Sequence, residues 1–256
     1  LSIIDDGKNV LMNVNDCPYE LAKSIFGDIK KQYDKINILL TGYGGAGPYP
    51  QCFDNFNLIE KKTAAKKKEY QFLTQAINYI DEINPDYYLP FAGTYTLTGK
   101  LSNLQNLRGV PSIDNAYQYL ENYYELKNLS NTIKPLKLNA GAEFDLDIKE
   151  YSKKYQNLNF DEYKLYIETK LSKKKLSYEN DVYPKFDEIY ELAKKAHEKF
   201  LNRILINSIK IKSDIFIKVN ENSLMISKNN GLDAIKTDNI DTMSKKYVRY
   251  EVDPRL

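Results

Sequence analysis

The chain has 256 residues, and with 42% of them hydrophobic it can bury the core of one large domain or of two small ones. Its 37 basic and 35 acidic residues nearly balance, which excludes the global field that would select nucleic acid or a membrane surface. No run approaches the roughly 20 apolar residues that a membrane-spanning helix needs. The two cysteines, Cys17 and Cys52, are too few for a disulfide framework, so we expect a cytoplasmic protein.

The N-terminal part of the chain predicts a β-hairpin followed by a β-helix-β unit. An Asp-Gly turn separates two short strands at Leu1–Ile4 and Asn9–Val14. Apolar residues near helical spacing predict a helix over Tyr19–Tyr33, and the continuous apolar run Ile36–Leu40 is typical of a strand covered on both faces. Because parallel neighbours end at the same edge of a sheet, the segments after the second and third strands should lie side by side.

Two segments at these strand ends are candidates for a site. Asp16 follows the second strand, where it could cap the next helix, the role that the residues alone favour, or serve as a metal ligand or general base. The loop Thr41–Phe53 holds four of the eleven glycines. The amides of Gly44–Gly47 could cradle an anion, but the loop lacks the lysine and hydroxyl of a P-loop, and a tight turn is an equally good interpretation. Three aromatic side chains of this loop could line a ligand pocket: Tyr43, Tyr49 and Phe53.

The rest of the chain alternates helical and extended patterns. A long helix is predicted over Leu58–Ile83, and the run Tyr87–Tyr95 predicts a further strand that ends in a small-residue turn. After Thr96 the pattern weakens. Further helices are expected over Asn115–Leu126, Asp147–Leu171 and Val182–Ile206, the last with Pro184 in its first turn. Extended segments are expected over Pro135–Leu138, Tyr247–Leu256, and a small antiparallel meander of Ile215–Val219, Ser223–Ser227 and Leu232–Ile235.

The remaining reactive side chains favour structural roles. His197 is the only histidine and lies on the apolar side of its helix, so no histidine cluster can form and a conventional zinc site cannot be built from these residues alone. Cys52 is better interpreted as an ordinary small residue than as a nucleophile, because no partner identifies a base for it. Two groups of lysines are simplest as solvated helix faces, with steering of an anionic substrate as a second interpretation: Lys61, Lys62, Lys66, Lys67 and Lys68, and Lys173–Lys175.

The order of three motifs resembles a known family. Asn13–Cys17, the segment Leu39–Pro50, a lysine-rich helix and Leu89–Gly93 together resemble the second half of a metallo-β-lactamase fold, closest to the CMP-N-acetylneuraminate hydroxylases and related bacterial metal-dependent hydrolase-like proteins. Asn139–Ala142 and Tyr247–Leu256 look like later elements of that family. The resemblance implies an αββα sandwich with two metals at the sheet edge. Residues 1–145 would form a metallo-β-lactamase-like half-domain, and residues 146–256 a helical and β extension.

The same resemblance implies roles for individual residues. It places Asp16 at the family's metal-binding aspartate, where zinc, iron or manganese would activate water or polarise the substrate. The family's H-x-H-x-D-H motif would precede Leu1, no histidine occupies the turn at Gly93–Thr94, and no Rieske motif is present, so no cofactor is expected for this chain alone. The resemblance implies that these residues border the metal pocket and contact substrate: Tyr43, Gly44, Gly45, Ala46, Gly47, Tyr49, Phe91, Gly93, Thr94 and Tyr95.

Two functions follow as hypotheses. The first is the C-terminal portion of a metal-dependent enzyme, hydrolase-like or hydroxylase-like, which acts on a sugar-nucleotide or phosphoester and is inactive without a histidine-bearing half joined in cis or in trans. The second is a non-catalytic binding module that kept the fold, lost its metal ligands and uses the loop pocket for a nucleotide-sugar or a protein partner. An unrelated α/β domain is a third hypothesis, and its sheet order would not place Asp16 beside Gly44–Gly47. Neither nucleic acid nor a membrane is expected as a partner.

Overall fold

The computed structural model describes residues 1–237, 247–253 and 255. It divides into two units, Leu1–Lys174 and Lys175–Leu256. Both contain helices and strands, so the chain is mixed α/β with more than one sheet. The boundary that the sequence predicts, between residues 145 and 146, falls between the two strands of a hairpin that the structure keeps inside the first unit.

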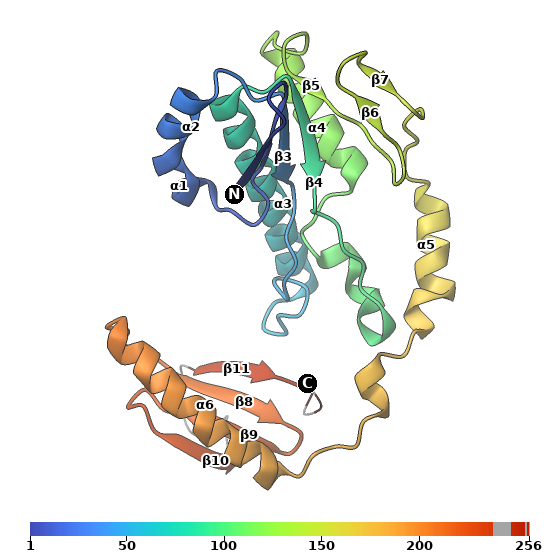
Figure 1. Cartoon of the computed structure of the whole chain (residues 1–256). Helices are drawn as coiled ribbons and strands as arrows, with labels where there is room; N and C mark the ends of the chain where they lie inside the picture. Colours follow the sequence, from blue (N-terminus) through green and yellow to red (C-terminus); the bar gives the residue numbers. More distant parts are fainter. Residues whose placement is uncertain (238–246, 254, 256) are drawn as a thin grey trace. The chain divides into compact units, whose positions relative to one another are not determined.

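The first unit is built on a five-stranded sheet in the order β1-β2-β3-β4-β5. β1 is antiparallel to β2, which confirms the predicted hairpin, and the strands from β2 to β5 are parallel to one another. Because each parallel strand neighbours the next along the chain, their carboxyl ends lie at one edge of the sheet (Figure 1). The strand bounds are β1 (Ser2–Asp5), β2 (Val10–Asn13), β3 (Ile38–Gly42), β4 (Tyr87–Phe91) and β5 (Lys134–Pro135).

Helices pack on one face of this sheet and form the main apolar core with it. Met12, Leu39 and Tyr88 point from neighbouring strands into this core and are each 0% exposed, against Ile80 and Leu120 of two helices. A single helix predicted over Tyr19–Tyr33 is in fact broken into three short pieces. The helical segments are α1 (Tyr19–Ala22), the 3₁₀ turn η1 (Lys23–Ile25), α2 (Phe26–Gln32), α3 (Leu58–Ile83) and α4 (Ile113–Leu126).

The helix α3 begins and ends where the sequence predicts. The Asn57 side chain accepts hydrogen bonds from the amides of Ile59 and Glu60, and the Glu60 carboxylate accepts one from the amide of Asn57. Asn84, in the left-handed conformation at φ 50°, ends the helix. At 1.5 Å per residue α3 is about 39 Å long, more than twice the length of β3 or β4. Its N-terminal half therefore extends past the carboxyl ends of the strands, where the loops of this edge pack on it (Figure 1).

The segment after β5 differs from the prediction of a helix over Asp147–Leu171. It contains a hairpin of β6 (Phe144–Asp145) and β7 (Glu150–Tyr151), and α5 starts only at Phe160 and ends at Thr169. The start is fixed by Asn159, whose side chain accepts hydrogen bonds from two amides of the first turn. Two 3₁₀ segments complete this unit, η2 (Gly99–Leu107) before α4 and η3 (Leu171–Lys173) after α5.

The second unit is a four-stranded sheet with one long helix, α6 (Phe186–Ile206), against β9 and β10. Pro184 lies outside this helix, because Lys185 is its N-cap. The predicted meander is confirmed by antiparallel pairs β8–β9 and β9–β10, and β11 adds a parallel strand beside β8. Of the predicted segment Tyr247–Leu256, residues 254 and 256 lie outside the described residues. The strands are β8 (Asp214–Val219), β9 (Asn222–Ile226), β10 (Leu232–Lys236) and β11 (Tyr247–Glu251), and a 3₁₀ turn, η4 (Ser177–Asn180), opens the unit.

The only histidine lies on α6, half-buried, with its ring 6.2 Å from that of Phe200. This position agrees with the structural role expected for His197. None of the helices in the described chain is long and apolar enough to cross a membrane.

Candidate functional site

Asp16 lies at the carboxyl end of β2, in the turn that leads to α1. The amide of Val14 donates a hydrogen bond to the carbonyl of Leu40, 3.0 Å away, so this turn starts directly beside the end of β3, as predicted. Asp16 is exposed and adopts φ 55°, and its carboxylate accepts a hydrogen bond of 3.2 Å from the Asn15 side chain. The interpretation of Asp16 as a helix cap is wrong, because Pro18 is the N-cap of α1 and no side chain caps that position.

A metal site needs several ligands close to Asp16. In the described ranges, which omit 238–246, 254 and 256, no group of three or more His, Cys, Asp or Glu side chains is arranged to hold a metal ion. The described residues therefore do not complete the metal centre that the resemblance implies. The role of Asp16 as one of its ligands stays a prediction.

The glycines of the loop after β3 are explained by close contacts with the loop after β4. A Cβ atom at Gly44 would lie 2.4 Å from the carbonyl oxygen of Gly93, and one at Gly45 would lie 2.7 Å from the Phe72 ring. At Gly93 a Cβ atom would meet the Tyr43 ring at 2.6 Å. These approaches support the interpretation of Gly44–Gly47 as a tight turn that its surroundings require.

Two lysines of α3 hold this loop in place. The ammonium group of Lys61 donates to the carbonyl of Gln51 at 3.1 Å, and that of Lys68 donates to the carbonyls of Tyr49 at 2.8 Å and of Arg108 at 3.2 Å. The prediction of solvated faces is therefore wrong for Lys61 and Lys68, because their long stems reach back to main-chain acceptors. Burial lowers the pKa of Lys68, and the nearby Arg108 lowers it further.

The predicted substrate residues divide into two groups. Tyr43 is buried, its hydroxyl lies 2.6 Å from that of Thr94, and both residues line the pocket described next. Tyr49 and Phe53 are exposed and contact each other, with ring centroids 5.0 Å apart, so these two aromatic residues do not serve the pocket as suggested. The remaining predicted positions also lie outside the pocket lining: Gly44, Gly45, Ala46, Gly47, Phe91, Gly93 and Tyr95.

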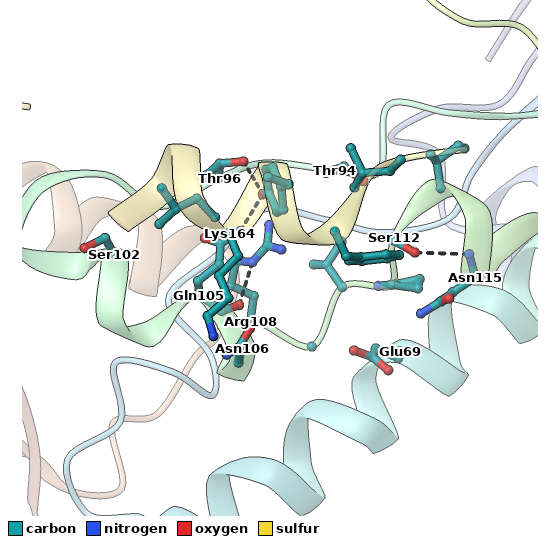
Figure 2. Close-up of a pocket in the computed structure, with 18 of the residues that line it drawn as sticks. Glu69, Thr94, Thr96, Ser102, Gln105, Asn106, Arg108, Ser112, Asn115 and Lys164 are labelled. Atoms are coloured by element: carbon teal, nitrogen blue, oxygen red, sulfur yellow. Dashed lines mark hydrogen bonds between the residues drawn. The ribbon is translucent and has the colours of Figure 1, made fainter. Parts of the chain in front are cut away.

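A pocket of about 960 Å³ opens beyond the carboxyl ends of β3 and β4. Figure 2 shows most of the residues that line it. Its walls come from the loop after β4, from η2 and the start of α4, from α5, and from the N-terminal half of α3, all within the first unit. Apolar surface is supplied by residues such as Val110, Ile113 and Ile167. Neutral polar side chains are set among them: Thr94, Thr96, Ser102, Asn103, Gln105, Asn106, Ser112 and Asn115.

Arg108 is the charged group most deeply placed in this wall. It is 9% exposed, its Nε atom donates to the carbonyl of Gln105 at 2.8 Å, and its guanidinium carbon lies 5.1 Å from the centroid of the Tyr95 ring. Within the described part of the chain, its buried Nη1 atom has no hydrogen-bond partner. Burial lowers the pKa of Arg108, against the opposing effects of Tyr163, Tyr95 and Glu69, but an arginine remains charged at neutral pH.

A network of hydrogen bonds fixes the wall around Arg108. The Gln105 side chain accepts from the amide of Leu97 at 2.8 Å and donates to the Tyr163 hydroxyl at 2.7 Å. That hydroxyl lies 2.6 Å from the hydroxyl of Thr96. The network ties α5 to η2 and to the loop after β4 (Figure 2), so the guanidinium is held in a preformed wall.

Glu69 lines the pocket from α3, apart from the wall that carries Arg108 (Figure 2). Burial raises the pKa of its carboxyl group, while the positive charges of Lys66 and Arg108 oppose this rise. The pocket thus holds a buried cation and a half-buried carboxylate that form no ion pair with each other.

The sequence contains one signal that could identify Arg108. It is one of only four arginines in a chain whose other basic residues are lysines, and it sits in the otherwise uncharged segment Leu107–Pro111. Arginine is favoured over lysine where a desolvated, planar cation must be held.

Comparison with known proteins found no matching family model, no similar curated protein and no similar solved structure.

Proposed function

We propose that the first unit is a binding module for a small molecule, and that its ligand occupies the pocket beyond β3 and β4. The observation that carries this proposal is the pocket itself, of about 960 Å³ at the carboxyl edge of a parallel sheet. Open α/β sheets bind ligands at this edge, and sites for small molecules typically have volumes of about 300–1,000 Å³. Walls that combine apolar surface with neutral polar and charged side chains suit a ligand that is partly desolvated and oriented by hydrogen bonds.

Binding is tested by NMR titration of the isotope-labelled full chain with a set of fragments that includes anionic, neutral and cationic members. Binders should shift the amide resonances of Thr94, Thr96 and Ser112. Asn106→Trp, which fills the pocket from its lining, should abolish these shifts, while Asn229→Trp in the second unit should preserve them. The proposal fails if no fragment shifts these resonances, or if Asn106→Trp binds fragments as the unmodified chain does.

A second candidate is the metal-dependent enzyme, and the position of Asp16 favours it. Asp16 is exposed in a left-handed turn at the end of β2, and strained turns of this kind are frequent in active sites. The sheet face away from the core carries half-buried apolar residues, Leu11, Leu40 and Leu89, on which the other half of an αββα sandwich would pack. Under this proposal another segment supplies the histidines, and the substrate is a sugar-nucleotide or phosphoester.

Metal analysis of the full-length product tests this second candidate. Zinc, iron or manganese should copurify with the protein, and Asp16→Ala should lower the metal content while the fold, followed by circular dichroism, is kept. Full-length protein without metal, or an unchanged metal content in Asp16→Ala, would remove the enzyme hypothesis and leave the binding module.

A further inference from the structure

We infer that the ligand of this pocket carries a carboxylate or phosphate group that pairs with Arg108, and that its other end presents hydrogen-bond donors to Glu69. The inference rests on the proposed function of the pocket. It goes further by naming the chemical class of the ligand, a small anion with hydroxyl or amino groups.

The first argument is that the buried charge of Arg108 has no ion-pair partner within the described residues. The residue is 9% exposed, lines the pocket and forms no ion pair with a described carboxylate. A desolvated cation without an ion-pair partner destabilises the fold. An anion in the pocket would remove this penalty, because it would supply the missing counter-charge in a site of low dielectric constant.

The geometry of the guanidinium suits an oxyanion. The bond from Nε to the carbonyl of Gln105 and the ring of Tyr95 fix the plane of the group. Its buried Nη1 atom has no hydrogen-bond partner among the described residues, and the planar guanidinium group matches two oxygens of a carboxylate or of a phosphate. Little side-chain entropy would be lost on binding, since the surrounding network already holds Arg108.

Besides Arg108, the charged groups of the pocket are Glu69 on α3, which is half-buried, and three exposed side chains of α5: Asp161, Lys164 and Glu168. Lys164 lies 3.9 Å from Glu168 on the same helix, so its charge is partly compensated within α5. Glu69 has no hydrogen-bond partner within the described residues, and an ionised carboxylate only accepts hydrogen bonds. A ligand that satisfies both Arg108 and Glu69 must therefore combine an anionic group with donors.

The test is NMR titration of the full chain with three probes at constant ionic strength: acetate, the uncharged acetamide of the same shape, and inorganic phosphate. Acetate or phosphate should shift the amides of Thr96, Gly109 and Ser112, and acetamide should do so at least tenfold more weakly. A response to only one of the two anions identifies which oxyanion the site takes. Equal binding of acetate and acetamide would overturn the inference.

Variants distinguish binding by the guanidinium group of Arg108 from general electrostatic attraction of the anion. Arg108→Gln should weaken binding of the preferred anion at least tenfold, and Arg108→Lys should weaken it less, because the charge stays and the fork is lost. Arg203→Lys, the same change at an exposed arginine of the second unit, is the matched control and should bind normally. Glu69→Gln should bind the anion several-fold more tightly, because a negative charge near the site is removed. This variant keeps the test decisive if Arg108→Gln does not fold.

The outcomes distinguish the two proposals. If neutral fragments bind the pocket while anions show no preference and Arg108→Lys has no effect, the pocket function stands and the anion inference is wrong. If no fragment or anion binds, both are wrong.

Discussion

Two arginines of this chain have little exposed surface, Arg108 being buried and Arg255 half-buried, and their surroundings differ in one group. In the second unit, the Arg255 side chain is 10% exposed and forms two hydrogen bonds of 2.9 Å with the Asp253 carboxylate. In the first unit, Arg108 is 9% exposed and has no such carboxylate among the described residues. Both contact aromatic rings, Tyr183 at 4.2 Å and Tyr95 at 5.1 Å, and both donate to a main-chain carbonyl.

The difference indicates what each site is for. Asp253 raises the pKa of Arg255 and completes its bonding, so that pair needs nothing from outside the chain. Arg108 has the same aromatic and main-chain support but keeps unused donor capacity in the wall of a pocket. A buried charge that the fold supports without neutralising is typical of a binding site, where strain or unpaired polarity is retained for function.

The largest expected effect comes from breaking the network of hydrogen bonds that fixes the wall around Arg108. Gln105 is 8% exposed, and Gln105→Leu would leave the amide of Leu97 without its partner and remove one of the two partners of the Tyr163 hydroxyl. We expect the free energy of unfolding to fall by about 1–3 kcal/mol, the range for a buried polar group left unsatisfied. Urea denaturation measures it, with Gln118→Leu on the exposed side of α4 as control. Equal effects of the two changes would mean that Arg108 is not held rigidly.

The next effect compares the two arginines directly. Arg108→Met, without ligand, should raise the free energy of unfolding by about 1 kcal/mol, because an apolar side chain of similar volume removes an unpaired buried charge. Arg255→Met should lower the stability of the second unit, since it leaves Asp253 without its bidentate partner. Hydrogen exchange of amides in each unit measures the two effects separately. If both variants lose stability, Arg108 is a structural arginine like Arg255.

Local signals explain which parts of the fold could be predicted from the sequence. The bounds of α3 follow from its capping residues and its apolar spacing, and the hairpin and meander follow from turn residues between short apolar strands. The helix expected over Asp147–Leu171 failed because its apolar residues serve a hairpin and a later helix, and only the cap at Asn159 decides where α5 begins. Tertiary contacts override propensity in such segments.

Only the location of the candidate site in the fold could be predicted from the sequence. Parallel strands bring the loops after β2, β3 and β4 to one edge. Tyr43, suggested by the aromatic residues of its loop, and Thr94, implied by the family resemblance, both line the pocket there. The wall that carries Arg108 comes from η2 and α5, where the periodicity is weak, and burial of a single arginine leaves no periodic trace in a sequence. Asp16 drew attention because it follows a strand, but it is exposed, outside the pocket lining.

The smallest expected effect concerns Glu69 and depends on pH. Burial raises the pKa of this carboxyl group in the folded state, against the opposing charges of Lys66 and Arg108, so the ionised form is disfavoured by folding. The penalty is complete above the folded-state pKa and disappears as the pH falls toward the lower pKa of the unfolded chain. Glu69→Gln, which cannot ionise, should therefore be more stable than the unmodified chain at pH 7, by less than about 1 kcal/mol for a partly exposed group.

Denaturation curves of both proteins between pH 7 and pH 4 measure this difference, which should shrink as the pH falls. A bound anion sharpens the comparison with Arg255. When phosphate neutralises Arg108, Glu69 loses a favourable neighbour, so its pKa should rise further. The difference between the two proteins should then begin to shrink at a higher pH as the solution is acidified. A difference that grows on acidification, or one that phosphate leaves unchanged, would show that Glu69 and Arg108 do not share one site.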